Sequence, residues 1–343
     1  MSTDESLIAA ALTDNLLNLG LRVREQIIAG RDLDRDPHAV GEGPGDTVFA
    51  IDRRLEPLVV AAMEALPEAL TPALVICEGL GVDGYRRVGP SNANLRYRIL
   101  IDPLDGTRSL AYDKRSGWFL AAAAPDLGEK TKISDAIASV MVELPTSKQG
   151  FADEFILCQG NWSGRRRSLT TDWQQPLNRH PSSESTLRHG FGHVSSFFPG
   201  TKRLAADLME HIAQTTLGSV SVSEALVFDD QYICSGGQMV ELMTGKDRFC
   251  CDLRPIFYEI LRRRGEGVVS GLCCHPYDLA GAPIAVAAGV VLTDGYGAPF
   301  DAPFDVESAI HWCGYANENL REAIEPVIQE WIQGQFARRA DEL

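Results

Sequence analysis

Positive charge and long apolar runs are both scarce in this sequence. Its 32 Lys and Arg residues stand against 47 Asp and Glu residues, for a formal net charge of -15, and no long basic run occurs. Binding to nucleic acid through phosphate neutralisation is therefore not expected. No stretch of about 18 apolar residues is present, so no membrane-spanning helix is predicted. The N-terminus lacks the basic segment of a secretory signal, and we expect a cytoplasmic protein.

Cysteines at zinc-binding spacing are missing as well. The eight cysteines include no Cys-x₂₋₄-Cys pair, the usual spacing in structural zinc sites. The adjacent pairs Cys250-Cys251 and Cys273-Cys274 leave zinc as an alternative. Because the chain is long and shows no secretory signal, we expect buried, reduced thiols instead.

Helical and strand-like patterns mix along the whole chain. Residues 5–29 carry apolar positions at helical spacing, and a second helix is expected at 46–66 with Asp46 as its N-cap. Apolar runs at 74–77 and 99–101 predict strands. The mixture predicts an α/β or α+β fold. A polar stretch without pattern suggests two sub-domains, 1–180 and 181–343.

The most informative stretch is an apolar strand that runs into Asp-Pro-Leu-Asp-Gly-Thr-Arg-Ser at 102–109. Asp102 and Asp105 stand three residues apart on a turn held by Pro and Gly, so their oxygens can point at one spot. Close like charges raise each other's pKa unless a cation lies between them. Oxygen ligands of this kind suit Mg²⁺, Mn²⁺ or Ca²⁺. By itself the string also fits two solvated aspartates at the end of a strand.

Two further carboxylates stand at the ends of predicted elements. Glu78 follows the strand at 74–77, and Asp278 lies at the start of a helix expected at 275–288. Added to the aspartate pair, they can hold two divalent ions that orient a water and lower its pKa beside a phosphoryl group. Thr107 can hold that water, and amides at Gly106 and Thr107 can receive an anion at a helix start. The pattern predicts a phosphatase site.

Two of these motifs, Asp102-Pro-Leu-Asp-Gly-Thr107 and Tyr277-Asp-Leu-Ala-Gly281, resemble the signature motifs of the inositol monophosphatase family. This Mg²⁺-dependent, lithium-sensitive superfamily also holds fructose-1,6-bisphosphatases and 3′,5′-bisphosphate nucleotidases. The similarity continues in order and rough spacing through Glu78-Gly79 and residues 291–301. It implies a layered α-β-α-β-α sandwich, a homodimer, and hydrolysis of a small phosphorylated sugar, inositol or nucleotide by a metal-activated water.

The resemblance also implies a role for individual residues. The metal ligands would be Glu78, Asp102, the Leu104 carbonyl, Asp105 and Asp278. Thr107, supported by Asp46 and with Glu78 nearby, would position the nucleophilic water. The substrate and its phosphate would contact Asp105, Gly106, Thr107, Arg108, Asp252 and Asp278. Two Mg²⁺ ions are implied, a third and weakly held ion stays open, and Mn²⁺ can take their place.

Departures from the family pattern leave the substrate open. Glu78-Gly79 stands where the family has two glutamates, and Arg108-Ser109 replaces the Thr-Asn common in inositol phosphatases. The second change is more similar to the nucleotidase branch. Asp252 is the nearest candidate for the family's substrate-gripping acid. We expect inositol-1-phosphatase-like activity, with nucleotidase-like or fructose-bisphosphatase-like activity as the alternative, and a non-catalytic metal- or phosphate-binding protein as a rival of another class.

Three consecutive arginines, Arg165 to Arg167, follow a predicted hairpin. A run of like charges is usually a solvated face, and this is the interpretation we favour. A contact with an anionic substrate is the alternative.

Overall fold

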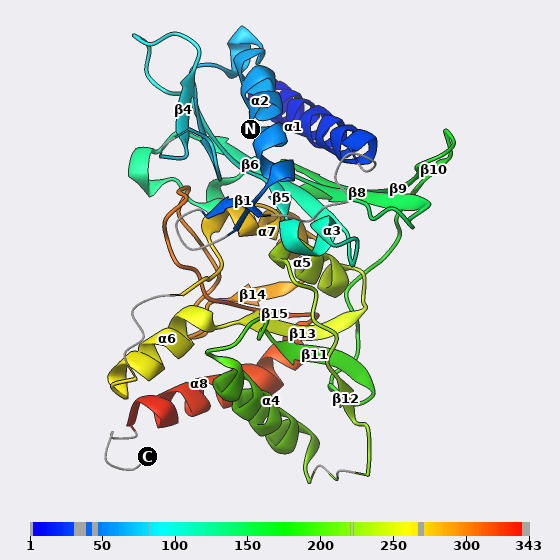
Figure 1. The fold of residues 1–343 in the computed structure, drawn as a ribbon, viewed down its shortest axis with the longest axis vertical. Helices are drawn as coiled ribbons and strands as arrows, with labels where there is room; N and C mark the ends of the chain where they lie inside the picture. The colour runs from blue at the N-terminus through cyan, green and yellow to red at the C-terminus, as the bar shows by residue number, and fades with distance from the viewer. Residues whose placement is uncertain are drawn as a thin grey trace.

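The computed structural model describes residues 3–30, 39–42, 47–81, 83–219, 221, 223–266 and 271–337. In these ranges the chain forms layers that alternate as helices, sheet, helices, sheet and helices (Figure 1). This is a mixed α/β sandwich of five layers. No helix of the described ranges combines the length and the apolar composition that crossing a membrane requires.

The first sheet has eight strands in the order β10-β9-β8-β7-β6-β5-β3-β4, and only β3 and β5 are parallel neighbours. Its strands are β3 (Ala73–Cys77), β4 (Tyr85–Val88), β5 (Tyr97–Asp105), β6 (Gly117–Pro125), β7 (Ala138–Leu144), β8 (Phe151–Cys158), β9 (Asn161–Ser168) and β10 (Gln174–Pro176). One face is covered by α1 (Thr3–Gly30) and α2 (Ala50–Glu64). A separate two-stranded sheet joins β1 (Ala39–Glu42) to β2 (Thr47–Phe49).

The second sheet has five strands in the order β12-β11-β13-β15-β14. They are β11 (Gly190–Val194), β12 (Val227–Phe228), β13 (Asp247–Asp252), β14 (Val291–Thr293) and β15 (Trp312–Tyr315). Between the two sheets lie α5 (Ser235–Met243) and α7 (Ala282–Ala287). The outer layer consists of α4 (Lys202–Leu217), α6 (Arg254–Arg263) and α8 (Glu318–Ala337).

Three apolar clusters match the spaces between helices and sheets. Ile99 and Ile101 of β5 belong to the cluster beneath α1 and α2, whereas Leu100 belongs to the cluster between the sheets. The third cluster joins the second sheet to the outer helices. Because both faces of the first sheet are covered, β5 begins as a continuous apolar run rather than an alternating one. This is why its sequence predicted a buried strand.

The helix expected at 5–29 is confirmed as α1, but the start of the second helix was predicted wrongly. Residues 47–49 pair with β1 as a strand, so α2 begins at Ala50. Asp46 lies outside the described residues. Its predicted place as the helix N-cap is not compatible with a helix that starts four residues later.

The single helix expected at 275–288 is two shorter helices. A 3₁₀ helix spans Pro276–Leu279, and α7 follows after Gly281. Pro283 has no N–H to donate to the carbonyl of Leu279, which favours a break here, and it is placed in the first turn of α7 instead.

The predicted division at residue 180 falls between the two sheets, since β10 ends at Pro176 and β11 begins at Gly190. The middle apolar cluster nevertheless contains residues from both sides of it. The division into sub-domains stays a prediction.

Candidate functional site

A bulge at the end of β5 places the two aspartates of the first motif. Asp102 pairs with Leu120 and Asp105 with Trp118, so three steps along β5 oppose two steps along β6. Residues three apart in a regular strand point to opposite faces, and the extra residue of a bulge cancels that alternation. Strand pairing thus continues to Asp105 instead of ending in a turn at Asp102, and both side chains can point toward the space between the sheets.

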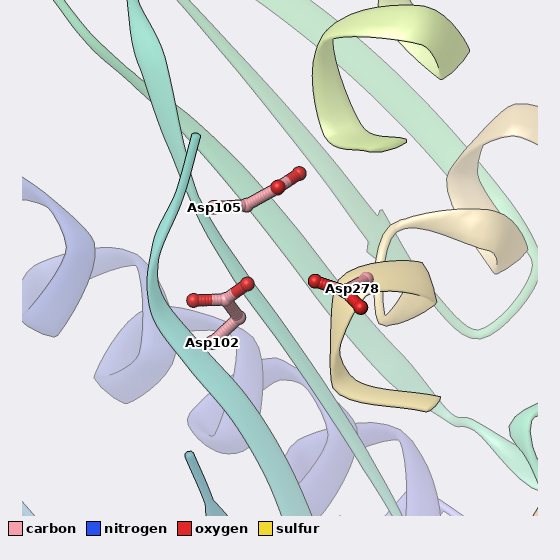
Figure 2. Close-up of side chains that lie close together, drawn as sticks. All are labelled: Asp102, Asp105 and Asp278. Atoms are coloured by element: carbon pink, nitrogen blue, oxygen red, sulfur yellow. The ribbon is translucent and has the colours of Figure 1, made fainter. Parts of the chain in front are cut away.

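Asp278 faces this pair from the 3₁₀ helix at Pro276–Leu279 (Figure 2). One carboxylate oxygen from each of Asp102, Asp105 and Asp278 lies within 4.8 Å of the other two. Asp102 and Asp105 are buried, with 1% and 6% of their surface exposed, and Asp278 is half-buried. Three carboxylates separated by up to 176 positions in sequence therefore share one small space.

Burial and mutual repulsion disfavour the charged form of all three acids. Burial, together with the neighbouring carboxylates, raises the pKa of Asp102 and Asp105 well above the usual range. Burial raises the pKa of Asp278 to about 6. The Oδ2 atom of Asp102 is buried and has no hydrogen-bond partner among the described residues. An all-oxygen donor set with an unpaired buried oxygen fits a hard divalent cation, which would remove the repulsion.

Backbone amides hold the three carboxylates in place. The Leu104 amide donates to Asp102 at 2.9 Å, and the His275 amide donates to Asp278 at 2.6 Å. The Gly236 amide, in the first turn of α5, donates to Asp105 at 2.6 Å. These bonds orient the acids and bring no positive charge to the site, so the repulsion among the ionised carboxylates is left for a cation to remove.

Glu78 lies beside the cluster but is not part of it. It directly follows β3, is exposed, and is close enough for its charge to raise the pKa of Asp102. Its carboxylate is not among those that meet within 4.8 Å. Its predicted roles as metal ligand and water activator stay predictions.

Leu104, Gly106 and Thr107 lie together at the start of α3 (Thr107–Ala111). The Thr107 hydroxyl donates to the Leu104 carbonyl at 2.9 Å. Gly106 has φ +88°, a left-handed conformation that glycine adopts at little cost. A Cβ at Gly106 would also lie 3.1 Å from Cys234 Cβ. The structure thus brings together the residues predicted to contact water and phosphate, whereas Asp46 lies outside the described residues.

Arg108 and Asp252, both predicted to contact the substrate, have different environments. Arg108 is exposed on α3. Asp252, at the end of β13, is buried and bound by Arg254, whose Nε lies 2.8 and 3.0 Å from the two carboxylate oxygens. The charge of Asp252 also raises the pKa of Asp278, so it lies near the cluster. Its role in substrate contact stays a prediction.

The start of α5 is a part of the site that the sequence pattern did not reveal. Cys234 caps this helix by accepting from the Gly237 amide at 3.3 Å, which leaves the Gly236 amide for Asp105. A Cβ at Gly236 would lie 2.9 Å from Leu120 and 3.0 Å from Asp105 Oδ2. The sequence Ser235-Gly-Gly237 could have indicated this contact. Small residues in the first turn of a helix allow another segment to approach its backbone closely.

The cysteines of this chain are free thiols. None of the eight is in a disulfide; six are buried, and Cys158 and Cys273 are half-buried. In the described part of the chain, the group of side chains able to share a metal consists of aspartates and includes no cysteine.

No family model matches this sequence, and no curated protein does either. Similar folds occur among solved structures. Fructose-1,6-bisphosphatase from Leishmania major, in holo form, superposes with a TM-score of 0.62 at 13% identity, over 98% of this chain and 95% of that one. The extragenic suppressor protein SuhB from Bartonella henselae gives 0.59 at 13%, over 93% and 99%.

This chain has the fold of these two proteins. The match covers nearly the whole length of each, so no large part of either fold is missing here. The layered sandwich implied by the motif resemblance is confirmed. At 13% identity the likeness establishes the fold, and the reaction has to be argued from the residues of the site.

Proposed function

We propose that this protein is a Mg²⁺-dependent phosphomonoesterase acting on a small phosphorylated sugar, inositol or nucleotide. The observation that carries the proposal is the meeting of Asp102 and Asp105, buried in β5 of the first sheet, with Asp278, half-buried in the 3₁₀ helix that leads into α7. The fold supports it, since one similar structure is named a fructose-1,6-bisphosphatase.

The three aspartates would hold the metal, with Glu78 and the Leu104 carbonyl as further ligands. Bound Mg²⁺ would lower the pKa of a water and screen the charge of the phosphoryl group. The Thr107 hydroxyl donates a hydrogen bond to the Leu104 carbonyl, so its oxygen can accept a hydrogen bond from a water and orient it. Amides at Gly106 and Thr107 would receive the phosphate. Mn²⁺ in place of Mg²⁺, and a third ion, belong to the same proposal.

The surroundings of Asp252 favour the nucleotidase-like or bisphosphatase-like alternative over an inositol phosphate. Both oxygens of Asp252 are already engaged by Arg254. The Arg254 guanidinium also lies 5.1 Å from the ring centre of Phe197 and 5.5 Å from that of Phe198. A substrate that binds through hydroxyl groups would have to compete with Arg254 for the oxygens of Asp252. A substrate that binds through a ring or a second anionic group would not need those oxygens.

A phosphate-release screen with Mg²⁺, with and without Li⁺, tests the proposal. The substrates are inositol 1-phosphate, fructose 1,6-bisphosphate, 3′-phosphoadenosine 5′-phosphate and histidinol phosphate. We expect Mg²⁺-dependent release from at least one of them, inhibited by Li⁺. If calorimetry shows Mg²⁺ binding and no ester is hydrolysed, the alternative of a non-catalytic metal- or phosphate-binding protein is favoured. That alternative rests on Gly79, which stands where the family has a second glutamate.

Assembly as a homodimer and location in the cytoplasm stay predictions. Size-exclusion chromatography with light scattering would test the first of them.

A further inference from the structure

Three arginines meet one carboxylate on the face of the first sheet that α1 covers. Arg24 of α1 and Arg165 and Arg167 of β9 all hydrogen-bond Glu154 of β8. The distances to its oxygens are 2.6 Å from Arg24 Nη1, 2.9 Å from Arg165 Nε and 3.0 Å from Arg167 Nε. Arg24 and Glu154 are buried, whereas the side chains of Arg165 and Arg167 are 36% and 37% exposed.

The charges in this cluster do not balance. Three guanidiniums carry three positive charges against the single negative charge of Glu154. Burial raises the pKa of Glu154, but Arg24 and Arg165 lower it by more, so the carboxylate stays ionised. The Arg24 Nε and Nη2 atoms are used by the carbonyls of Glu143 and Asp153. Burial lowers the pKa of Arg24, and the nearby charges of Glu154 and Glu143 act against that lowering. At least one positive charge is left over, and it lies with the partly exposed arginines of β9.

The third arginine of the sequence triplet has a different environment. Arg166 points to the opposite face of β9 and binds both oxygens of Asp153, at 2.7 and 2.8 Å. Its charge is matched one to one. The triplet is therefore not a single solvated face, because alternate residues of a strand point to opposite sides.

A cavity of about 500 Å³ adjoins the cluster. Its walls include Glu154 and Arg165 together with Leu17 of α1, Ile156 of β8 and Pro176 of β10. The volume is in the range of small-molecule sites, about 300–1,000 Å³. In Figure 1, β9 and β10 project past α1, which leaves this corner of the sheet uncovered by the helix. The corner combines excess positive charge with an apolar wall.

This cavity is separate from the candidate metal centre. In the sheet order, β9 is four strands away from β5, which carries Asp102 and Asp105. Neighbouring strands lie about 4.8 Å apart, so the two positions are roughly 19 Å from each other. A ligand in the cavity would not be the substrate held at the metal centre.

We propose that this cavity binds a small organic phosphate. The phosphate group would lie against Arg165 of the cavity wall, and its apolar or planar body against Leu17, Ile156 and Pro176. Arg165 Nε and Nη2 both donate to Glu154. The Nη1 side of the guanidinium is the part that would donate charge-assisted hydrogen bonds to phosphate oxygens. The proposal does not depend on the phosphatase proposal.

Titration with phenylphosphonate tests the site directly. This compound carries a phosphate-like dianion on a planar ring. Its phosphorus is bonded directly to carbon, so it has no phosphate ester that a phosphomonoesterase could hydrolyse. Calorimetry is done on the full chain in EDTA, which keeps divalent metal out of the candidate metal centre. We expect binding to one site, weaker at higher salt because the contacts are partly exposed ion pairs. Methylphosphonate, which lacks the ring, should bind more weakly.

Matched variants on the same strand decide where the ligand binds. Arg165→Gln should weaken binding at least about tenfold, because charge-assisted hydrogen bonds are lost. Arg166→Gln removes one positive charge as well, but from the opposite face, and should leave the affinity unchanged. Gln174→Glu, an exposed change on β10, adds a negative charge to the cavity wall and should weaken binding even if Arg165→Gln fails to fold.

Equal loss of affinity in Arg166→Gln would show a general charge effect and overturn the proposal. Absence of binding to the wild type, or full affinity in Gln174→Glu, would overturn it as well. Hydrolysis of phosphate esters is not part of this readout, so failure here is distinct from failure of the phosphatase proposal.

Discussion

Asp105 and Glu154 are both buried carboxylates, and the groups around them send their pKa in opposite directions. Three arginines hydrogen-bond Glu154, and two of them, Arg24 and Arg165, lower its pKa. Asp105 has other acids for neighbours, and its pKa is raised by burial and by Asp278. Glu154 is paired with arginines inside the protein. Asp105, with acids for neighbours, would be stabilised in its charged form by a bound cation. That difference separates a structural ion pair from a ligand site.

A buried histidine outside the candidate metal centre, His193, makes the stability of the fold depend on pH. Burial lowers the pKa of His193 from 6.5 to about 4. It contacts Gln238 at 3.1 Å, and its Nδ1 lies 3.8 Å from Asp247 Oδ2. The unfolded chain takes up a proton below pH 6.5 and the folded chain only near pH 4, so His193 reduces stability as pH falls through this window.

We expect the His193 contribution to cost the wild type about 3 kcal/mol of unfolding free energy between pH 7 and pH 4. Urea unfolding at both pH values measures it. His193→Gln removes the titrating group, so the variant should lose less stability over the same interval. A variant as acid-sensitive as the wild type would contradict this assignment.

At the scale of elements, the apolar runs of β3 and β5 predicted strands because both faces of their sheet are buried. The β5 bulge was not predicted, since pattern alone does not show how many residues of β6 oppose Asp102 and Asp105. The contact of α5 with Asp105 was missed for a similar reason. It uses the backbone amide of Gly236, and a backbone donor leaves little trace in side-chain composition.

The first turn of α5 has no room for a side chain at Gly236. In Gly236→Ala the new Cβ would lie 2.9 Å from Leu120, 3.0 Å from Asp105 Oδ2 and 3.1 Å from Trp118. Either Asp105 or the helix must move, and groups that orient metal ligands typically change metal affinity by about 10- to 100-fold. We expect the Mg²⁺ concentration for half-maximal binding to rise about tenfold in calorimetry.

Gly150→Ala is the control, because a Cβ there meets nothing within 4 Å. It should bind Mg²⁺ like the wild type. Unchanged Mg²⁺ affinity in Gly236→Ala would show that α5 does not position Asp105.

On the scale of the whole molecule, the candidate site joins the two sheets. Asp102 and Asp105 belong to the first sheet, and Asp278 belongs to the segment that leads into α7 between the sheets. Here, the buried Ser139 hydroxyl of β7 donates to the Ala280 carbonyl at 2.7 Å. The motif resemblance predicted that Asp278 lies near Asp102 and Asp105. Sequence spacing alone could not predict this, because no local pattern connects residues so far apart.

A cation bound at this junction should stabilise the molecule as a whole. At a concentration one hundred times its Kd, Mg²⁺ would add about 2.7 kcal/mol, which for a chain of this length raises the Tm by roughly 4 °C. Asp278→Asn should lose most of that increase. Asp126→Asn is the control, since Asp126 pairs with Arg98 at 2.6 Å and is not in the cluster. If Mg²⁺ raises the Tm of Asp278→Asn as much as that of the wild type, the cation binds elsewhere.

The most direct test of the central claim is Mg²⁺-dependent phosphate release by Asp105→Asn, measured on the ester that the wild type hydrolyses fastest. The substitution keeps the shape of the side chain and removes a charge from the cluster. We expect no release above background, while Asp126→Asn keeps wild-type turnover. Retained turnover in Asp105→Asn would contradict the assignment of Asp102, Asp105 and Asp278 as the metal centre of a phosphatase.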